Sequence, residues 1–405
     1  MTLIRPFAAL RPVPGRAADV IAPPYDVLSS AEARVRASGR PWSFLHISRP
    51  EIDLPEDTDS HAPEVYARAA TNLQAMLEQG VLARDESPCY YVYRIIMGEH
   101  CQTGLVVAAS VAAYDSNRIR KHEFTRPDKE DDRVQQIESL HAQTGPVLLA
   151  YESQQQVDTL LMTAAEGVAD VDLKADDGVR HLLWVVRDDG LIEKITTAFD
   201  AMDALYIADG HHRSAAASRV AASHQGAAGT DAFLAVVFPH RQMQIFDYNR
   251  VVRDLAGMTP ETLLARIAGS FSVTPETAAV RPDSPATFGM YLAGQWYRLV
   301  IRENLIPDDP VGRLDVSLLA DKLLAPLLGI QDPRRDTRID FVGGIRGLGE
   351  LEKRVDCGDM AAAFSMYPTR MEDLMAVADA GEVMPPKSTW FEPKLADGLV
   401  SLVFD

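Results

Sequence analysis

The stretch Tyr206-Ile207-Ala208-Asp209-Gly210-His211-His212-Arg213-Ser214-Ala215-Ala216-Ala217 carries the strongest local signal for both fold and site. An apolar run ends at Asp209-Gly210, and an alanine-rich run that favours a helix begins directly after it. The pattern predicts a short strand that turns at once into a helix. Such a turn directs backbone N–H groups and the positive end of the helix dipole at one place, where a phosphate can bind.

The side chains of this turn suit phosphate chemistry. Gly210 lets an anion approach the main chain, and the planar guanidinium of Arg213 can donate two hydrogen bonds. Asp209 is expected to hold a metal ion or to accept a proton. The alternative is an ordinary capped helix with a surface arginine, but two consecutive histidines between Asp209 and Arg213 favour a functional turn.

Periodicity outside the turn predicts a mixed α/β (α+β) fold. Apolar residues recur at helical spacing over residues 64–79, and β-branched and aromatic residues at 90–97 and 103–114 flank a turn at 98–100. A buried strand is expected at 146–151. Three regions follow from these patterns: an N-terminal α/β region at 1–145, a phosphate-binding region at 146–255 and a C-terminal α/β region at 256–405.

Composition limits the class of protein. The chain has 405 residues, 47% of them hydrophobic, and a formal charge of −18, which argues against a nucleic acid backbone as the main partner. No window of about 18 uncharged apolar residues is present, so no membrane span is expected. The three cysteines have no spacing suited to zinc or to a disulfide framework. A cytoplasmic enzyme with small-molecule partners is the expectation.

A second candidate is the charged stretch at residues 120–133. It is either a solvated charged surface or a clamp for a polyanion. In the second case Glu123 or Asp132 is a metal ligand or base, and the cations that hold phosphate are Lys121, Arg126, Lys129 and Arg133.

Two further loops are candidates. Residues 384–394 contain Lys387, Ser388, Thr389 and Lys394, which could reach a phosphate. Prolines stand where a P-loop has glycines, so this is a phosphate-binding loop of another kind or a structural turn. Within the N-terminal loops, His46, Arg49 and Glu51 either bind the carboxylate and ammonium of a substrate or brace the fold.

Several of these motifs together resemble a family of bacterial and archaeal proteins known as a domain of unknown function within the ParB/sulfiredoxin-like superfamily. The matching motifs span nearly the whole chain and are Pro23-Pro24-Tyr25-Asp26-Val27, residues 46–51, Lys121-His122-Glu123 with Arg126-Pro127, Asp209-Gly210-His211-His212-Arg213, Asn249-Arg250-Val251 and residues 385–391. His211 stands where sulfiredoxins carry their reactive cysteine, which excludes that chemistry.

The resemblance also extends to free L-serine kinases, and it implies a kinase that uses inorganic pyrophosphate and Mg²⁺. On this basis Asp209 contributes to the metal or catalytic site, and Gly210, His211, His212 and Arg213 would hold the phosphate donor. On chemical grounds alone, Glu123 or Asp209 is expected to accept the hydroxyl proton, and His212 is counted with them in the catalytic group. The alternative is a nucleotide-responsive switch protein of the ParB type that transfers no phosphoryl group.

Overall fold

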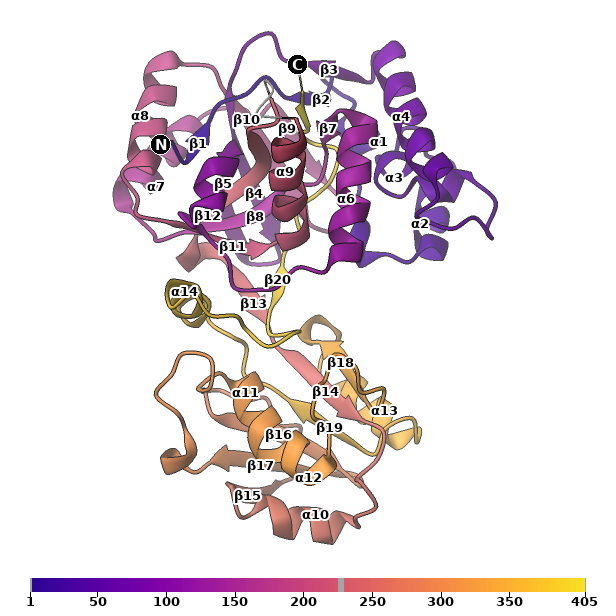
Figure 1. The fold of residues 1–405 in the computed structure, drawn as a ribbon, viewed down its shortest axis with the longest axis vertical. Helices are drawn as coiled ribbons and strands as arrows, with labels where there is room; N and C mark the ends of the chain where they lie inside the picture. Colours follow the sequence, from indigo (N-terminus) through magenta and orange to yellow (C-terminus); the bar gives the residue numbers. More distant parts are fainter. Residues whose placement is uncertain (1, 225–228, 405) are drawn as a thin grey trace. The chain divides into compact units, whose positions relative to one another are not determined.

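The computed structural model describes residues 2–224 and 229–404. Its contacts divide the chain into two compact units, one formed by Met1–Met243 with Pro393–Asp405 and the other by Gln244–Glu392 (Figure 1). The second unit is therefore inserted into the sequence of the first. The boundaries of these two units differ from those of the three regions that the sequence predicts. That the three regions are separate domains stays a prediction.

A large mixed sheet forms the centre of the first unit. Its strands follow the order β6-β11-β8-β12-β5-β4-β10-β9, and β1 pairs with β5 outside this path. The pairs β11/β6 and β12/β8 are parallel, whereas β11 runs antiparallel to β8. The bounds are β1 (Ile4–Arg5), β4 (Tyr90–Met97), β5 (His100–Ser110), β6 (Ile119–Arg120), β8 (Val147–Tyr151), β9 (Val171–Lys174), β10 (Arg180–Val186), β11 (Leu205–Asp209) and β12 (Ala232–Pro239).

One face of this sheet packs against helices. Alternate residues of β8, namely Val147, Leu149 and Tyr151, belong to the same buried cluster as residues of α7, α8 and α9, as expected where side chains alternate between the faces of a strand. The helices concerned are α7 (Gln155–Ala164), α8 (Asp189–Asp200) and α9 (His211–Ser223). The small alanines of α9 let this helix lie close to the strands.

A helical layer continues from α9. Helix α6 (Pro127–Leu140) contacts α9 through Ile137, Ala216 and Val220, and its other neighbour is α4 (Pro63–Glu78). A separate buried cluster joins α4 to the N-terminal elements. These elements are β2 (Leu10–Pro12), α1 (Ala17–Val20), the 3₁₀ turn η1 (Tyr25–Val27), α2 (Ser30–Ala37), α3 (Leu45–Ser48), η2 (Pro50–Asp53) and β3 (Leu82–Arg84), with β7 (Ala142–Gln143) and β21 (Leu402–Val403) nearby in unit 1.

The second unit has its own antiparallel sheet in the order β15-β17-β16-β19-β14-β18 and a strand pair β13/β20. Its strands are β13 (Gln244–Phe246), β14 (Tyr248–Val252), β15 (Phe271–Glu276), β16 (Thr287–Leu292), β17 (Gln295–Ile301), β18 (Ile339–Gly343), β19 (Ala362–Ser365) and β20 (Trp390–Glu392). Its helices are α10 (Pro260–Ile267), α11 (Asp315–Leu319), a π-helical turn (Ala320–Leu324), α12 (Ala325–Leu328), α13 (Gly349–Asp356) and α14 (Met371–Asp379).

The expected mixed α/β class is confirmed, and so are the helix near 64–79 and the strand near 146–151. The predicted hairpin is present with Met97 opposite His100, but the expected strand at 103–114 is too long. Strand β5 ends at Ser110, whose side chain accepts a hydrogen bond from the Ala113 amide and caps the short helix α5 (Val111–Asp115).

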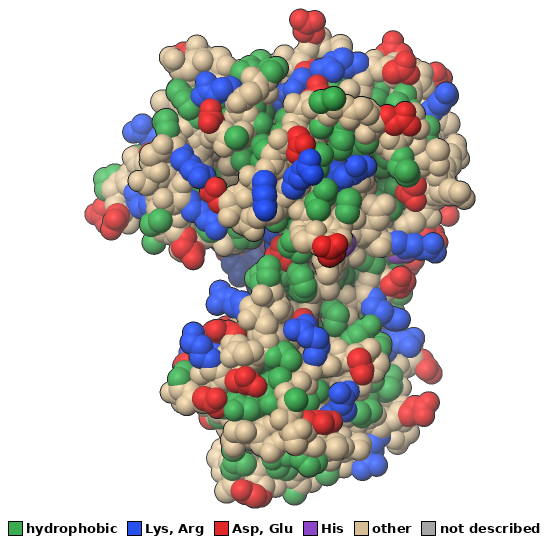
Figure 2. Space-filling view, turned by 180° about the vertical axis from the view of Figure 1, so that it is seen from behind, with side chains coloured by type: hydrophobic (Ala, Val, Ile, Leu, Met, Phe, Trp, Pro, Cys, Tyr) green, Lys and Arg blue, Asp and Glu red, His purple; other side chains and the backbone are tan. Residues whose placement is uncertain are grey.

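Acidic and basic side chains are interspersed on the face shown in Figure 2. Among the described residues, no helix is both long and apolar enough to cross a membrane.

Candidate functional site

The predicted strand–turn–helix is present at Asp209–Arg213. Strand β11 ends at Asp209, Gly210 adopts the left-handed conformation with φ +95°, and α9 begins at His211. The amides of Arg213 and Ser214 both donate to the Gly210 carbonyl, at 2.9 and 3.2 Å. Because the leading amides of a helix have no acceptor within it, the N–H groups of His211 and His212 are available to an anion at this end of α9.

The carboxylate of Asp209 is held in its charged form. One oxygen accepts a hydrogen bond from the Gly210 amide at 2.8 Å, and the other lies 3.3 Å from the ammonium of Lys394. Burial alone would raise the pKa of Asp209, but the charges of Lys394 and Arg213 hold it below its ordinary value. Since its side chain is 40% exposed, this carboxylate can meet a bound cation or phosphate.

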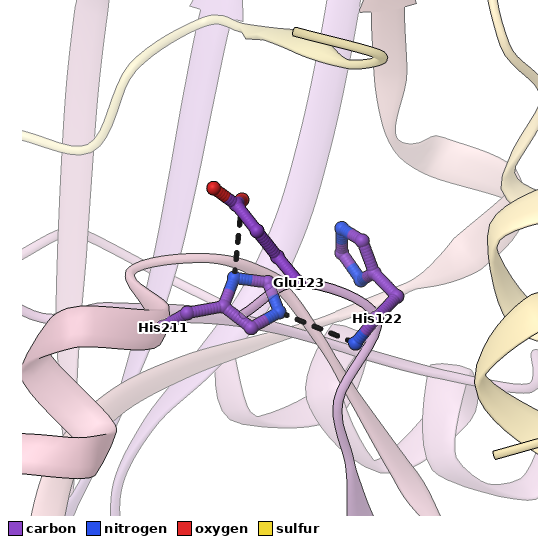
Figure 3. Close-up of side chains that lie close together, drawn as sticks. All are labelled: His122, Glu123 and His211. Atoms are coloured by element: carbon purple, nitrogen blue, oxygen red, sulfur yellow. Dashed lines mark hydrogen bonds and ion pairs between the residues drawn. The ribbon is translucent and has the colours of Figure 1, made fainter. Parts of the chain in front are cut away.

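His211, His122 and Glu123 form a cluster at the start of α9 (Figure 3). The His122 backbone N–H donates to Nε2 of His211 at 3.5 Å, while Nδ1 of His211 lies 3.8 Å from a Glu123 oxygen. The rings of His122 and His211 meet edge to face with centroids 4.5 Å apart. Burial lowers the pKa of His211 well below its ordinary value, so this imidazole is neutral and its Nδ1 proton is directed at Glu123.

The second imidazole of the cluster has an available lone pair. Burial lowers the pKa of His122 to about 4, and its ring bonds to the Ile207 backbone. In the described chain Nδ1 of His122 is buried without a hydrogen-bond partner, so the bond to Ile207 uses Nε2–H and leaves Nδ1 unprotonated. Two imidazoles and a carboxylate can ligate a divalent ion, or Glu123 can act as a base beside a neutral imidazole.

The predicted phosphate-holding cations lie around this cluster in different settings. The ammonium of Lys121 lies over the Tyr114 ring, 3.9 Å from its centroid, and burial lowers the pKa of Lys121. Arg126 is exposed and pairs with Asp128 at 2.8 Å, while its amide donates to Nε2 of His212 at 3.1 Å. His212 thus fixes the segment that carries Glu123 to the first turn of α9.

Arg213 is anchored away from the turn rather than pointing freely into it. Its guanidinium donates to the Pro146 carbonyl at 2.6 Å and to Asp26 at 3.1 Å, and it lies over the ring of Tyr25. Asp397, from the C-terminal segment, is buried nearby. Burial raises the pKa of Asp397 to about 7. The positive charge of Arg213 opposes this shift only in part, because Arg213 also pairs with Asp26, whose negative charge raises the pKa of Asp397 further.

Sequence reasoning gave no role to Tyr25, Asp26 or Asp397. The motif Pro23-Pro24-Tyr25-Asp26-Val27 was the available signal for the first two. Nothing local distinguishes Asp397, because it reaches the site through the return of the C-terminal segment to the first unit. Lys394, predicted to reach a phosphate, lies in the same segment and pairs with Asp209.

The other predicted site residues make contacts of their own. His46 contacts Asp53 at 2.8 Å, and Arg49 contacts Glu51 at 2.9 Å, so these side chains brace the loops that precede α4. Their role in substrate binding stays a prediction.

Lys387, Ser388 and Thr389 belong to the second unit, where the Lys387 carbonyl accepts a hydrogen bond from Arg250. Their binding of phosphate also stays a prediction.

Replacement of Gly210 by Ala tests the turn. A left-handed residue with a Cβ costs about 1–2 kcal/mol, and here the new Cβ would also lie 3.3 Å from Val147 Cα. Gly80→Ala is the matched control, because Gly80 has φ +62° and nothing within 4 Å of a Cβ. We expect the Gly210 variant to lose more unfolding free energy in urea; equal losses would show that Val147 does not crowd the turn.

The protonation of Asp397 has a consequence for stability. Because its folded-state pKa lies near 7 and an unfolded aspartate titrates near 3.8, the folded state binds the extra proton between these values. The wild type should therefore lose stability relative to Asp397→Asn as the pH rises from 5 to 8, by on the order of 2–4 kcal/mol. Urea unfolding at several pH values measures this difference, and a pH-independent difference would contradict it.

Comparison with solved structures gives distant likenesses. A free serine kinase mutant in complex with AMP matches at 11% identity and a TM-score of 0.38, covering 74% of this chain and 92% of that one. SbnI from Staphylococcus aureus, with a C-terminal truncation, matches at 14% identity and a TM-score of 0.37, covering 73% and 87%. A conserved hypothetical protein from Pyrococcus furiosus matches at 14% identity and 0.36, covering 73% and 94%.

A search of curated proteins gives no significant match. Residues 4–317 match the model of a family described as a protein of unknown function, DUF1015. That match covers most of the chain, including the turn at Asp209–Arg213, and the chain therefore belongs to the DUF1015 family.

Proposed function

We propose that this protein is a small-molecule kinase that transfers a phosphoryl group from pyrophosphate to the hydroxyl of free L-serine. The observation that carries the proposal is the turn at Gly210, where the first amides of α9 follow a charged Asp209 and His211 lies beside the carboxylate of Glu123. The choice of donor and acceptor rests on the motif resemblance to kinases of this kind.

The proposed reaction needs positioning and charge neutralisation more than covalent chemistry. The serine hydroxyl oxygen bonds to the terminal phosphorus, the bond from that phosphorus to the bridging oxygen breaks, and inorganic phosphate leaves. The hydroxyl proton passes to Glu123. Its carboxylate faces the neutral His211, whose Nδ1–H can stabilise the negative charge before the transfer.

Asp209 is better suited to a cation than to a proton. Its lowered pKa makes it a weak base, whereas an accessible carboxylate is the hard oxygen donor that Mg²⁺ prefers. Asp209 would hold Mg²⁺, which supplies charge neutralisation on the phosphates. Lys121, Arg126 and Arg213 add positive charge around the same turn.

Phosphorus NMR tests the proposal directly. Purified protein with Mg²⁺ and L-serine receives pyrophosphate, ADP or ATP in separate tubes, and we expect O-phosphoserine and inorganic phosphate in the pyrophosphate tube. O-phosphoserine with ADP or ATP instead would change the donor. If every donor binds but stays intact, the kinase proposal fails and the switch hypothesis takes its place.

Replacement of Asp209 by Asn is expected to lower turnover at least a hundredfold, because the metal-binding charge is lost, while the fold is retained. Asp172→Asn is the matched control, since Asp172 is a salt-bridged aspartate of similar exposure on the same unit, 43% against 40%. Initial rates of O-phosphoserine formation and circular dichroism measure activity and fold. Undiminished turnover in Asp209→Asn would remove this residue from the site.

A further inference from the structure

A polar cavity lies beside the turn at Asp209–Arg213, entirely within the first unit. It is partly open to solvent and leaves about 30 Å³ of space for the centres of water-sized molecules. Its polar walls come from distant parts of the chain: Tyr25 of η1, Ser48 of α3, Arg133 of α6, Thr144, Arg213 of α9 and Asp397 of the C-terminal segment. No role in the proposed reaction has so far been given to this space.

Two polar atoms of the cavity wall lack a protein partner. Over residues 2–224 and 229–404, Oγ of Ser48 and Nε of Arg213 are buried and make no hydrogen bond. Buried donors without an acceptor are rare, because each costs about 1–3 kcal/mol. Both atoms can donate, so they call for a ligand that accepts hydrogen bonds.

The charges of the cavity are mixed rather than uniformly positive. Arg133 lies over the Tyr25 ring, 4.0 Å from its centroid, and is tied to Asp132 through Nε and Nη2. Arg213 approaches the same ring and pairs with Asp26, which does not line the cavity, whereas Asp397 supplies a carboxyl group to the wall. A molecule with one carboxylate and one ammonium group matches the basic and acidic groups of this wall.

The cavity and the turn at Asp209–Arg213 lie on either side of the Arg213 side chain. The Nη1 atom of Arg213 is 3.6 Å from the point where a Cβ on Gly210 would lie, and its Nε is 3.6 Å from the corresponding point at Gly145 on the cavity side. One side chain thus separates the two spaces. A small ligand in the cavity would have its free end close to a phosphate at Gly210.

We propose that this cavity binds the α-carboxylate and α-ammonium groups of the free amino acid that accepts the phosphoryl group. Arg133, Ser48 and Nε of Arg213 bind the carboxylate, and Asp397 binds the ammonium group. The inference rests on the proposed kinase function for the fate of the hydroxyl, but binding of the amino acid can be measured without turnover.

The experiment compares ligand binding by calorimetry in the full-length protein. L-serine is the probe, with L-serinamide lacking the carboxylate and 3-hydroxypropionate lacking the ammonium. We expect wild type to bind both analogues at least tenfold more weakly than L-serine. Arg133→Met should weaken L-serine binding roughly tenfold to a hundredfold, the worth of a charge-assisted hydrogen bond, and leave pyrophosphate binding unchanged.

Two variants separate this role from a structural one. Gly145→Ala puts a methyl group into the cavity at ordinary contact distance, 3.6 Å from Arg213 Nε and 3.7 Å from Asp397 Oδ1, so it should fold normally and still weaken L-serine binding. Gly349→Ala, with nothing within 4 Å of a Cβ, is its control. Arg219→Met is the control for Arg133→Met, because Arg219 lies on α9 with an exposed ion pair to Asp131.

The outcomes distinguish the inference from the kinase proposal. If L-serine binds and Arg133→Met and Gly145→Ala abolish this binding, the cavity assignment holds even where no donor yields O-phosphoserine. If O-phosphoserine forms and both variants keep the wild-type KM for L-serine, the kinase proposal holds and the cavity assignment fails. Loss of pyrophosphate binding in Arg133→Met, with L-serine binding intact, would also overturn it by making the cavity a phosphate subsite.

Discussion

The anchoring of Arg213 is the interaction on which the geometry of the site depends. Its guanidinium joins the first turn of α9 to the Pro146 carbonyl at the start of β8 and to Asp26 in the N-terminal loops. These contacts fix the turn at Gly210 against two other parts of the unit. Since removal of one partner of a buried charge costs several kcal/mol, the network resists rearrangement and keeps the turn in one conformation.

The C-terminal segment completes the same site from the other end of the chain. Lys394 faces Asp209, Asp397 pairs its backbone with Ala22, and Ser401 does the same with Leu10. The first unit is therefore complete only where the chain returns to it, after the inserted second unit, Gln244–Glu392. This connectivity makes the charge balance at Asp209 depend on residues that follow the turn by nearly half the chain.

The sequence predicted what local patterns can encode. The amphipathic helix α4, the hairpin with its turn at Gly98 and the strand–turn–helix unit β11–α9 all follow from periodicity and turn residues. The helix α5 was missed because one capping serine, Ser110, ends a strand of β-favouring composition. The cavity was missed because Tyr25, Arg133 and Asp397 meet through tertiary packing, which single-sequence patterns do not describe.

Arg213 also explains how two nearby carboxyl groups come to differ in protonation. Asp209 has Lys394 as well as Arg213, and together these cations keep it charged although its surroundings partly shield it from water. Asp397 shares Arg213 with Asp26, so burial prevails and its pKa rises to about 7. A carboxyl group poised in this way ionises readily when a cation arrives beside it, whereas Asp209 carries its charge beforehand. The turn thus presents a fixed negative charge at Asp209, whereas the carboxyl group of Asp397 gains its charge near neutral pH or beside a cation.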